Sequence, residues 1–347
     1  MARREVSASD VAKAAGVSRT TVSFVLNNTP GKNISEGTRQ RVLSAAEQLG
    51  YTPNEAARSL ALSKRRVVGL LICHTQHVYT DAFIMRVIEG MSLAVNRARI
   101  RLVVQPITLK DADYLQIAER LELDGMVLIN AHDNDPGLEG LVNARFPAVA
   151  MDYLPEVDIS QVYVNGHDAA ERAVNYLIEL GHRDIAMITH ARPVYAAARQ
   201  RTEGYRRALD AHGIEFNPEL LRIGDFSEES GYRGMAELLD SAKPPTAVFA
   251  GNDVIAYGAI DAANERGISI PDQLSLVGYD DDYLSRYMNP PLTTVVMPAA
   301  GMGSTAVNTL VDLLDGESSE TVRHELPTQL AYRDSCTAIS SLDSSAD

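Results

Sequence analysis

The stretch DVAKAAGVSRTTVSFVLNN, residues 10–28, contains two runs of apolar residues at helical spacing. The apolar positions of the two runs are Val11, Ala14, Ala15, Val22, Val25 and Leu26. Gly16 lies between the runs, where the lack of a Cβ atom permits a tight turn. Ser7 and Ser18 are placed to cap the two helices. The stretch therefore predicts a helix-turn-helix.

The outward face of the second helix is small, polar or cationic apart from one aromatic residue. It consists of Arg19, Thr20, Thr21, Ser23, Phe24 and Asn27. Such a face suits a helix that lies in the major groove of DNA. A small helical hairpin with solvated faces would show the same pattern, so the pattern alone leaves both interpretations open.

Two further helical segments follow this stretch. Residues 35–49 predict a third helix, which Ser35 caps and Gly50 ends. The apolar stripe of this helix is Val42, Leu43, Ala46 and Leu49. Residues 53–63, PNEAARSLALS, permit a short helix, although about ten residues are marginal for a helix in water. This last segment is therefore either a conditional helix or a linker with incidental helicity.

The charge of the chain is divided unevenly between its two ends. The formal net charge is −14, which is unusual for a DNA-binding protein. Residues 1–66 contain 11 Lys and Arg against 5 Asp and Glu, whereas the remainder contains 21 against 41. A cationic end on an acidic body concentrates the attraction for phosphate in one place.

Length and composition restrict the class of protein. A chain of 347 residues is too long for one ordinary core, so two or three domains are expected. The first ten residues do not resemble a secretion signal, and no apolar run approaches the roughly 18 to 20 residues of a membrane span. The two cysteines, Cys73 and Cys336, suggest neither a zinc site nor a disulfide scaffold. We expect a soluble cytoplasmic protein.

From Val67 onward, apolar runs alternate with helical stretches. Runs at residues 67–73, 101–107 and 124–130 are separated by the amphipathic stretches AFIMRVIEGMSLAV and YLQIAERL. Continuous apolar runs are typical of buried parallel strands, and the alternation predicts a doubly wound α/β sheet. A second half with the same rhythm begins near Val162.

Polar side chains follow several predicted strands, which is where ligands bind in open α/β sheets. Asp152 follows the strand PAVAM, Asn252 follows TAVFAG, and Asp280 follows LSLVGY. Arg201 lies at the start of a predicted helix. Carboxylates and a guanidinium group suit the hydroxyl groups of a sugar because each can form paired hydrogen bonds.

For several neighbouring residues the sequence favours a structural role. We expect Asp253 to cap the following helix, and Asp281 and Asp282 to lie in a solvated turn, since no other metal ligands cluster beside them. Phe226 and Tyr195 suit either a flat apolar wall of a cleft or ordinary packing.

Motifs of enzymes and cofactor sites are absent or incomplete. Residues 301–306, GMGSTA, fit the pattern G-x-G-x-x-A, but no acidic residue follows at the end of a second strand, so we reject NAD binding. The chain has no HExxH, GxSxG or P-loop lysine pattern, and its histidines show no metal-ligand spacing. We expect no cofactor, no metal and no enzymatic activity. A sugar-binding receptor and an α/β enzyme acting on a sugar are the alternatives.

Seven blocks together resemble the LacI/GalR family of bacterial transcription regulators. They are DVAKAAGVSRTTVSFVLN, SEGTRQRVLSAAEQLGYTPNEAARSL, LIELGHRDIAMI, RTEGYRRAL, AVFAGNDVIAYGA, LSLVGYDD and PPLTTV. The blocks span nearly the whole chain in the order and spacing of the family.

The resemblance implies a domain organisation. A helix-turn-helix headpiece at 1–52 and a hinge helix with linker at 53–66 precede an effector-binding and dimerisation domain at 67–335, and 336–347 form a flexible tail. The large domain has two Rossmann-like lobes, as in periplasmic binding proteins, with a ligand cleft between them. The expected bounds are about 67–163 and 293–323 for lobe 1, and about 164–292 and 324–335 for lobe 2. The chain should cross between the lobes near Val164, Leu292 and Glu325.

The resemblance also implies a function. A homodimer would bind a pseudo-palindromic operator in double-stranded DNA and repress sugar-utilisation genes. A small ligand, expected to be a sugar, would bind in the cleft and control operator affinity through the folding of the hinge helix. The tail shows no leucine heptads, so a dimer is expected rather than a tetramer.

Individual residues receive roles from this family pattern. We expect base reading from Arg19, Thr20 and Phe24. We expect phosphate contacts from Ser18, Thr21, Ser23, Asn27, Ser35, Thr38 and Asn54. Leu60 matches the family's wedge residue, which enters the minor groove at the centre of the operator. We expect effector binding from Tyr79, Asp81, Asp152, Arg201, Phe226, Asn252 and Asp280.

Two positions depart from the family pattern. Phe24 stands where many members carry an arginine that reads a base, which implies an unusual operator preference or an apolar contact to a thymine methyl group. Residues 164–166, Val-Asn-Gly, replace a frequent Asp-Asn pair where the chain crosses between lobes. The resemblance therefore does not fix the geometry of this crossing.

The hinge assignment predicts the behaviour of a Leu60→Ala variant. We expect its operator affinity to fall several-fold or more, because the wedge that bends the duplex is lost, while effector binding stays intact. A gel-shift titration on operator DNA measures the first property and a thermal shift with effector the second. Unchanged operator affinity would contradict the hinge assignment.

Overall fold

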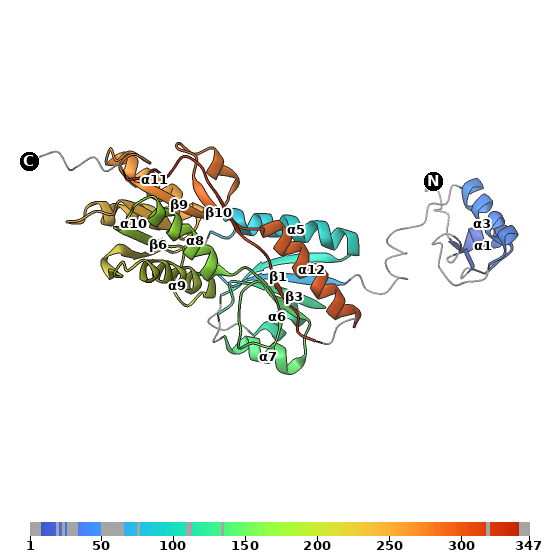
Figure 1. Cartoon of the computed structure of the whole chain (residues 1–347). Coiled ribbons are helices and arrows are strands. Elements are labelled where there is room, and N and C mark those ends of the chain that lie inside the picture. The colour runs from blue at the N-terminus through green and yellow to red at the C-terminus, as the bar shows by residue number, and fades with distance from the viewer. Residues whose placement is uncertain are drawn as a thin grey trace, which may run out of the picture. The chain divides into compact units, whose positions relative to one another are not determined.

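The computed structural model describes residues 8–18, 21–22, 25, 34–49, 66–74, 77–108, 113–132, 135–316 and 320–339. The chain divides into two compact units, residues 1–65 and residues 66–347, and each is described by itself (Figure 1). None of the helices in these described ranges is long and apolar enough to cross a membrane.

The first unit is a small helical core. Helix α1 covers Ala8–Ala15 and helix α3 covers Glu36–Gln48. Gly16 has a φ of 64°, which gives the expected turn after α1. The buried apolar residues of this unit are Val11, Ala12, Ala15, Val22, Val25, Val42, Ala45 and Ala46.

Three of the apolar positions expected in this core are exposed. Ala14 faces solvent, and Leu43 and Leu49 are 43% and 37% exposed. Ala12 and Ala45 are buried instead, so the packed face of each helix is rotated slightly from the predicted stripe. The periodicity of a short alanine-rich helix does not fix this rotation, since small residues are tolerated on both faces.

Lobe 1 of the second unit is built on a six-stranded parallel sheet with the order β11-β5-β4-β3-β1-β2. Its strands are β1 (Val67–Ile72), β2 (Arg101–Pro106), β3 (Gly125–Ile129), β4 (Ala148–Ala150), β5 (Ser160–Tyr163) and β11 (Arg323–Glu325). Its helices are α5 (Ala82–Ala98), α6 (Tyr114–Arg120), α7 (Pro136–Ala144) and α12 (Ala299–Asp315). Helices α5 and α12 pack on one face of the sheet and α6 and α7 on the other (Figure 1).

Lobe 2 has a second six-stranded sheet with the order β12-β10-β9-β8-β6-β7, in which only β12 is antiparallel to its neighbour. Its strands are β6 (Ile185–Thr189), β7 (Leu221–Ile223), β8 (Ala247–Ala250), β9 (Ser275–Asp280), β10 (Thr293–Val296) and β12 (Gln329–Ala331). Its helices are α8 (Gly166–Glu179), α9 (Ala196–Ala211), α10 (Glu228–Leu239) and α11 (Asp253–Glu265), with 3-10 turns η2 (Pro218–Leu220) and η3 (Tyr283–Arg286).

The predicted α/β core of two lobes is confirmed. Strands β1, β3, β6 and β8 are buried along their whole length, as their continuous apolar sequences indicated. The first crossing between the sheets follows β5, at residues 164–165, where it was expected.

The other two crossings differ from the expected positions. Strand β10 pairs with β9, so residues 293–296 belong to lobe 2 and the chain crosses at residues 297–298 rather than near Leu292. Residues 323–325 pair with β5, so His324 and Glu325 belong to lobe 1 and the third crossing follows them. Strand β10 ends at Val296, and Pro298 is the N-cap residue of helix α12, which begins at Ala299.

The first residues of the tail expected at 336–347 are packed on the core. The N–H of Thr337 donates to Ser275 Oγ at 3.0 Å, and the N–H of Ile339 donates to the carbonyl of Leu180 at 2.9 Å. Residues 336–339 therefore pack on lobe 2, and the remaining residues of the expected tail lie outside the described ranges.

Close contact between α5 and α12 accounts for the glycines of the GMGSTA segment. The two helices run side by side on lobe 1 (Figure 1). A Cβ atom at Gly90 would overlap the backbone carbonyl of Ala300, and one at Gly303 would overlap that of Val87. The segment lies inside a helix, and its glycines allow two helix backbones to approach each other.

Substitution of Gly90 tests this contact. Gly90→Ala should lower the free energy of unfolding by about 1–3 kcal/mol, because the helices must move apart or strain. Gly140→Ala is the matched control, since Gly140 also lies in a helix and has open space around its Cβ position. The control should be neutral or about 0.5–1 kcal/mol more stable. Urea unfolding followed by circular dichroism measures both, and equal stabilities would refute the close contact.

Candidate ligand-binding site

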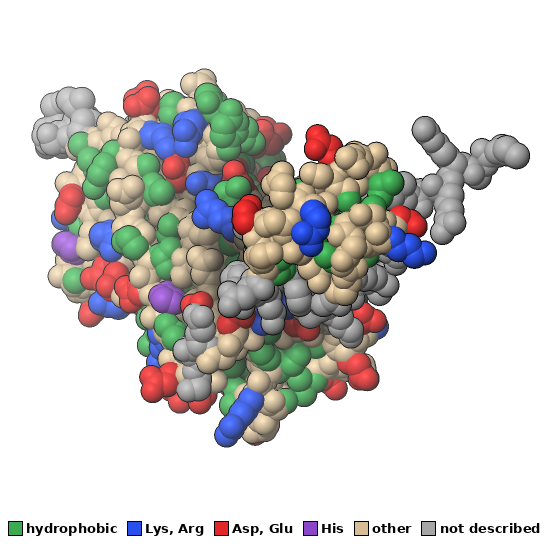
Figure 2. Space-filling model, turned by 90° about the vertical axis from the view of Figure 1, so that its right-hand side faces the viewer, with side chains coloured by type: hydrophobic (Ala, Val, Ile, Leu, Met, Phe, Trp, Pro, Cys, Tyr) green, Lys and Arg blue, Asp and Glu red, His purple; other side chains and the backbone are tan. Residues whose placement is uncertain are grey.

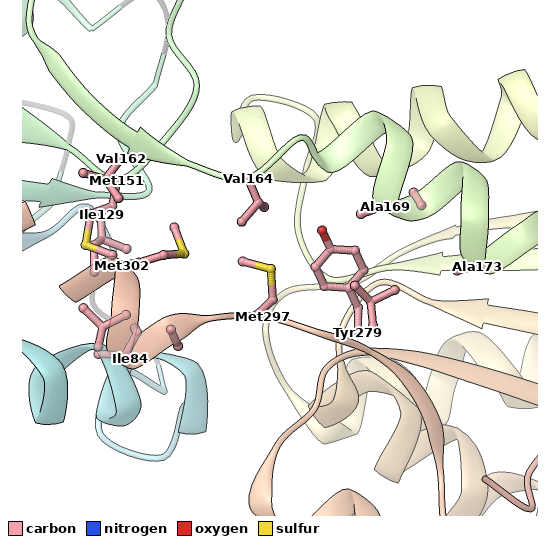
Figure 3. Packing of buried hydrophobic residues seen from close by; sticks show 14 of the residues in the cluster. Ile84, Ile129, Met151, Val162, Val164, Ala169, Ala173, Tyr279, Met297 and Met302 are labelled. Carbon is pink, nitrogen blue, oxygen red and sulfur yellow. The ribbon is translucent and has the colours of Figure 1, made fainter. Parts of the chain in front are cut away.

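A cavity lies where the carboxyl ends of the two sheets meet. Its lining includes residues that end or directly follow strands of lobe 1, namely Asn130, Met151, Asp152, Tyr163 and Val164. It also includes residues that end or follow strands of lobe 2, namely His190, Asn252, Asp280 and Met297. Figure 3 shows Met151 and Met302 on the lobe 1 side, Tyr279 on the lobe 2 side, and Val164 and Met297 on the crossing segments between them. The cavity is therefore formed by both lobes.

Six of the seven expected effector-binding residues line this cavity. They are Asp81, Asp152, Arg201, Phe226, Asn252 and Asp280. Tyr79 does not line it, and its side chain is 69% exposed. The N–H groups of Thr80 and Asp81 both donate to the carbonyl of His77 at 3.0 Å, and this turn leaves Tyr79 on the outer surface.

Arg201 is buried at the centre of the lobe 2 wall, with 7% of its surface exposed. Its Nη1 donates to the carbonyl of Gly251 and to Nδ1 of His190, the latter at 3.3 Å. Its guanidinium carbon lies 3.7 Å from the ring centre of Tyr279, in a cation–π contact. Burial and the adjacent guanidinium keep the pKa of His190 well below its usual value, so the imidazole is neutral and accepts this hydrogen bond.

Asp280 ends strand β9 in a strained conformation. Its φ is 116° and that of Asp281 is 50°, which are both uncommon for residues with a side chain. Its Oδ1 is buried and has no hydrogen-bond partner among the described residues, because Nη2 of Arg201 is 3.8 Å away. Burial raises the pKa of Asp280 well above its usual value, and the charge of Arg201 opposes this shift.

Asp81 provides a carboxylate of lobe 1 that interacts electrostatically with this pair. It caps α5 by accepting hydrogen bonds from the N–H groups of Phe83 at 2.9 Å and Ile84 at 3.3 Å. Burial raises the pKa of Asp81, while these backbone donors and Arg201 lower it. The same side chain therefore fixes the start of a helix and contributes charge to the cavity.

Asn252, not Asp253, caps helix α11, so the expected role of Asp253 is wrong. Oδ1 of Asn252 accepts a hydrogen bond from the N–H of Ile255 at 2.9 Å. Asp253 is 1% exposed and accepts hydrogen bonds from the N–H of Asp282 at 2.8 Å, from Ser285 Oγ at 2.5 Å and from Thr294 Oγ1 at 2.6 Å. Asp253 therefore holds the loop that follows Asp280.

The expected solvated turn at Asp281 and Asp282 is buried. Each residue is 8% exposed. Asp281 Oδ1 lies 2.5 Å from Nη2 of Arg333, and Asp282 Oδ2 accepts a hydrogen bond from Tyr257 at 2.8 Å. Within the fold Asp281 forms an ion pair with Arg333 and Asp282 accepts a hydrogen bond from a tyrosine, which a run of three aspartates in the sequence does not reveal. The described residues contain no group of three potential metal ligands.

An aromatic cluster forms one side of the cavity and joins the two lobes. His74 of lobe 1 stacks on Phe226 of lobe 2 with ring centres 4.6 Å apart and an interplanar angle of 3°. Tyr195 contacts Phe226 edge-on at 5.2 Å, and His132 of lobe 1 contacts Tyr195 at 4.7 Å. Phe226 lines the cavity, whereas Tyr195 packs behind it.

Several lining residues were not found from the sequence. They include Gln200, His190, Tyr163, Tyr279, Met297 and Met302. His190 directly follows strand β6, so its position after an apolar run was an available signal. Gln200 and Met302 lie on helices, where the sequence gives no sign that they face a cavity rather than the core.

Four of the expected DNA-contacting residues fall within the described ranges. Ser18 Oγ accepts a hydrogen bond from the N–H of Thr21 at 3.1 Å, and Ser35 Oγ accepts one from the N–H of Thr38 at 3.4 Å. Both serines are therefore helix caps and both are exposed. The expected residues outside the described ranges are Arg19, Thr20, Ser23, Phe24, Asn27, Asn54 and Leu60.

Comparison with known proteins assigns the chain to a family. Residues 8–54 match the family model of bacterial regulatory proteins of the lacI family, and residues 174–336 match that of a periplasmic binding protein-like domain. The chain is 34% identical to the transcriptional regulator CelR of Thermobifida fusca over 340 residues, which cover 96% of this chain and 99% of that protein. This chain belongs to the lacI family. It is a DNA-binding transcriptional regulator and not an enzyme.

Solved structures of lacI-family members share its fold. The complex of CelR with cellobiose is similar with a TM-score of 0.72 at 32% identity, over 95% of this chain and 100% of that one. The lac repressor dimer bound to operator and the anti-inducer ONPF is similar with a TM-score of 0.80 at 27% identity, over 96% and 100% of the two chains.

The burial of Asp253 predicts a pH dependence for this lacI-family protein. Burial raises the pKa of Asp253 from 3.8 to about 7. The folded state therefore holds a proton that the unfolded state releases as the pH rises above about 4. The stability that this group contributes is fully present below pH 4 and is lost as the pH approaches 7.

An Asp253→Asn variant isolates this effect. Relative to the variant, the free energy of unfolding of the natural protein should fall by up to about 4 kcal/mol between pH 4 and pH 7 and then stay level. Urea unfolding of both proteins across this range measures the difference. Parallel curves would show that Asp253 does not titrate in this way.

Proposed function

We propose that the protein is a homodimeric repressor whose affinity for a pseudo-palindromic operator is controlled by a small sugar in the cavity between its lobes. The placement of Asp81 and Asp152 from lobe 1 opposite Arg201, Asn252 and Asp280 from lobe 2 carries this proposal. Carboxylate, amide and guanidinium groups in a partly apolar cavity suit the hydroxyl groups and C–H faces of a sugar. The complex of the relative CelR with cellobiose supports the same ligand class.

A ligand that bridges the two lobes would change their relative orientation. Arg86 of α5 donates from Nη1 to the carbonyl of Asp281 at 3.0 Å, which links lobe 1 to the residue after Asp280. A ligand hydroxyl bound by Asp280 and Asp81 acts on both ends of this link. The resulting rotation of lobe 1 would alter the spacing of the hinge segments, and with it the folding of the hinge helix on DNA.

The charge distribution supports DNA binding through the cationic end of the chain, and one exposed apolar surface supports a homodimer. Asp and Glu side chains are visible in several places in Figure 2, and the sequence after residue 66 contains 21 Lys and Arg against 41 Asp and Glu. Tyr283 and Leu284 on η3 are 63% and 52% exposed and Tyr287, directly after η3, is 64% exposed, which suits self-association. Operator binding by the lac repressor dimer supports the dimer on DNA. A regulator of transcription acts at the chromosome, so we place it in the cytoplasm.

Selection from randomised palindromic duplexes by gel shift tests the proposed function. The natural protein should retard a specific duplex, and a sugar found by thermal-shift screening should change the retarded fraction. Failure to retard any duplex would refute the operator function.

Arg201→Ala tests the effector site in the same assay. The variant should retard the operator but lose the response to the sugar, because its removal leaves His190, Gly251 and Asp280 without their buried partner. Arg207→Ala is the matched control, since Arg207 lies on the same helix with its side chain 55% exposed. Thermal melts establish that both variants fold, and an unchanged dose response in Arg201→Ala would place the ligand elsewhere.

A further inference from the structure

We infer that the cavity selects uncharged, hydroxyl-rich ligands and rejects their phosphorylated or carboxylated derivatives. This inference rests on the proposed effector role of the cavity and concerns the charge of the effector. It follows from three properties of the lining: the balance of acidic and basic groups, the partners that the cationic group already has, and the buried carboxylate oxygen of Asp280 that lacks a hydrogen-bond partner.

Acidic groups outnumber basic groups in the lining. Asp81, Asp152 and Asp280 line the cavity, and Arg201 is the single Lys or Arg among the described lining residues. His190 adds no charge, because burial and Arg201 keep its pKa well below the usual value. An anionic ligand would therefore be repelled by each of these carboxyl groups that is ionised, at short range in a poorly solvated site.

The guanidinium group of Arg201 is already engaged. Its Nη1 donates to Gly251 and to His190, its plane lies over Tyr279, and its Nη2 faces the carboxylate of Asp280. Sites for phosphate or carboxylate commonly present two guanidinium N–H groups in parallel to the anion. An anion at this site would have to compete with Asp280 for Arg201.

Three helix N-termini near the cavity carry their own capping side chains, whereas α9 and α12, whose first turns also line the cavity, begin without a side-chain cap. Backbone N–H groups at a helix start are the other common ligands of phosphate. At α5 they donate to Asp81, and at α11 the N–H of Ile255 donates to Asn252. At α8 the N–H of Asp168 donates to Oδ1 of Asn165 at 3.1 Å. Each of these helix starts supplies its own capping side chain in the place that an anion would take.

Asp280 needs a hydrogen-bond donor from the ligand. Its buried Oδ1 has no hydrogen-bond partner among the described residues. A sugar hydroxyl can donate to it, whereas a carboxylate or a fully ionised phosphate group has no proton to donate. Burial raises the pKa of both Asp280 and Asp81, which means that the site already disfavours the negative charges that it contains.

Uncharged surface elsewhere in the lining fits the rest of such a ligand. Figure 3 shows Met151, Met297 and Met302 grouped around the junction of the lobes. Methionine side chains adapt to irregular shapes and suit the C–H faces of a sugar ring. The ligand thus finds acceptors for its hydroxyl groups on both lobes and apolar contacts between them.

Paired probes test the inference on the full-length protein. We would measure melting temperature and calorimetric affinity with cellobiose and cellobionic acid, glucose and glucose 6-phosphate, glucose and glucuronic acid, and ribose and ribose 5-phosphate. At least one uncharged member should bind, and its anionic partner should bind at least tenfold more weakly. An anionic member that binds as tightly as its partner would overturn the inference, and so would the absence of binding by every uncharged member at 10 mM.

Asp280→Asn provides a second measurement that depends on the same charge. The substitution should weaken binding of the uncharged ligand, because an acceptor for its hydroxyl group is lost. It should also reduce the ratio of affinities between the uncharged and anionic members, because a carboxyl group that repels an anion when ionised is removed. Asp261→Asn is the matched control, since Asp261 lies exposed on α11 and does not line the cavity. An unchanged ratio in Asp280→Asn would contradict the inference.

A gel shift on the selected operator distinguishes a failure of the charge inference from a failure of the proposed regulatory function. If the protein retards the operator and an anionic sugar is the tighter ligand, the inference fails and the regulatory function stands. If no duplex is retarded, the proposed function fails whatever the outcome of the ligand measurements.

Discussion

Two parallel sheets that direct their carboxyl ends at one another impose the main constraint on this protein. In a parallel sheet the loops that follow the carboxyl ends of the strands all leave from the same edge, so each strand contributes residues to the same place. Here Asp152, Asn252 and Asp280 follow or end three different strands and line a single cavity. Two of the three crossings between the lobes run beside this cavity, since Val164 and Met297 also line it. The ligand site and the pivot of the lobes are therefore built from the same segments.

The energetic difficulty of this arrangement is the burial of charge at the junction. A buried guanidinium is costly unless its donors are satisfied, and the closest carboxylate, Asp280, is too far away for a hydrogen bond. Instead, Gly251 and His190 accept hydrogen bonds from Arg201, and the ring of Tyr279 packs against its guanidinium group. Oδ1 of Asp280 is therefore left without a hydrogen-bond donor among the described residues. On the lobe 2 side of the cavity, Arg201 is thus fixed by its partners, whereas Asp280 still lacks a hydrogen-bond donor.

Much of this organisation could be predicted from the sequence because strong local signals specify it. Continuous apolar runs located the parallel strands, and the polar residues after them located most of the acidic lining. The sequence failed where two adjacent residues compete for one role. Asn252 and Asp253 are both good helix caps, and only the position of Ser285 and Thr294, more than 30 residues away, draws Asp253 inward. The strand β10 was assigned to the wrong lobe for a similar reason, because strand pairing is a long-range property.

Helix α12 gives the proposed coupling a physical route. It begins directly after a crossing segment, and Met302 in its first turn lines the cavity. The contact between Gly303 and the backbone of Val87 leaves no space between α12 and α5, whose capping residue Asp81 lies in the same cavity. At the other end of α12, the carbonyl of Leu314 accepts a hydrogen bond at 3.1 Å from Arg66, the residue at which the linker from the DNA-binding unit enters the core. Closely packed helices transmit a shift as rigid bodies rather than absorb it. Under the proposed coupling, a ligand that repositions Asp81 relative to Asp280 also moves Arg66, where the linker joins the core.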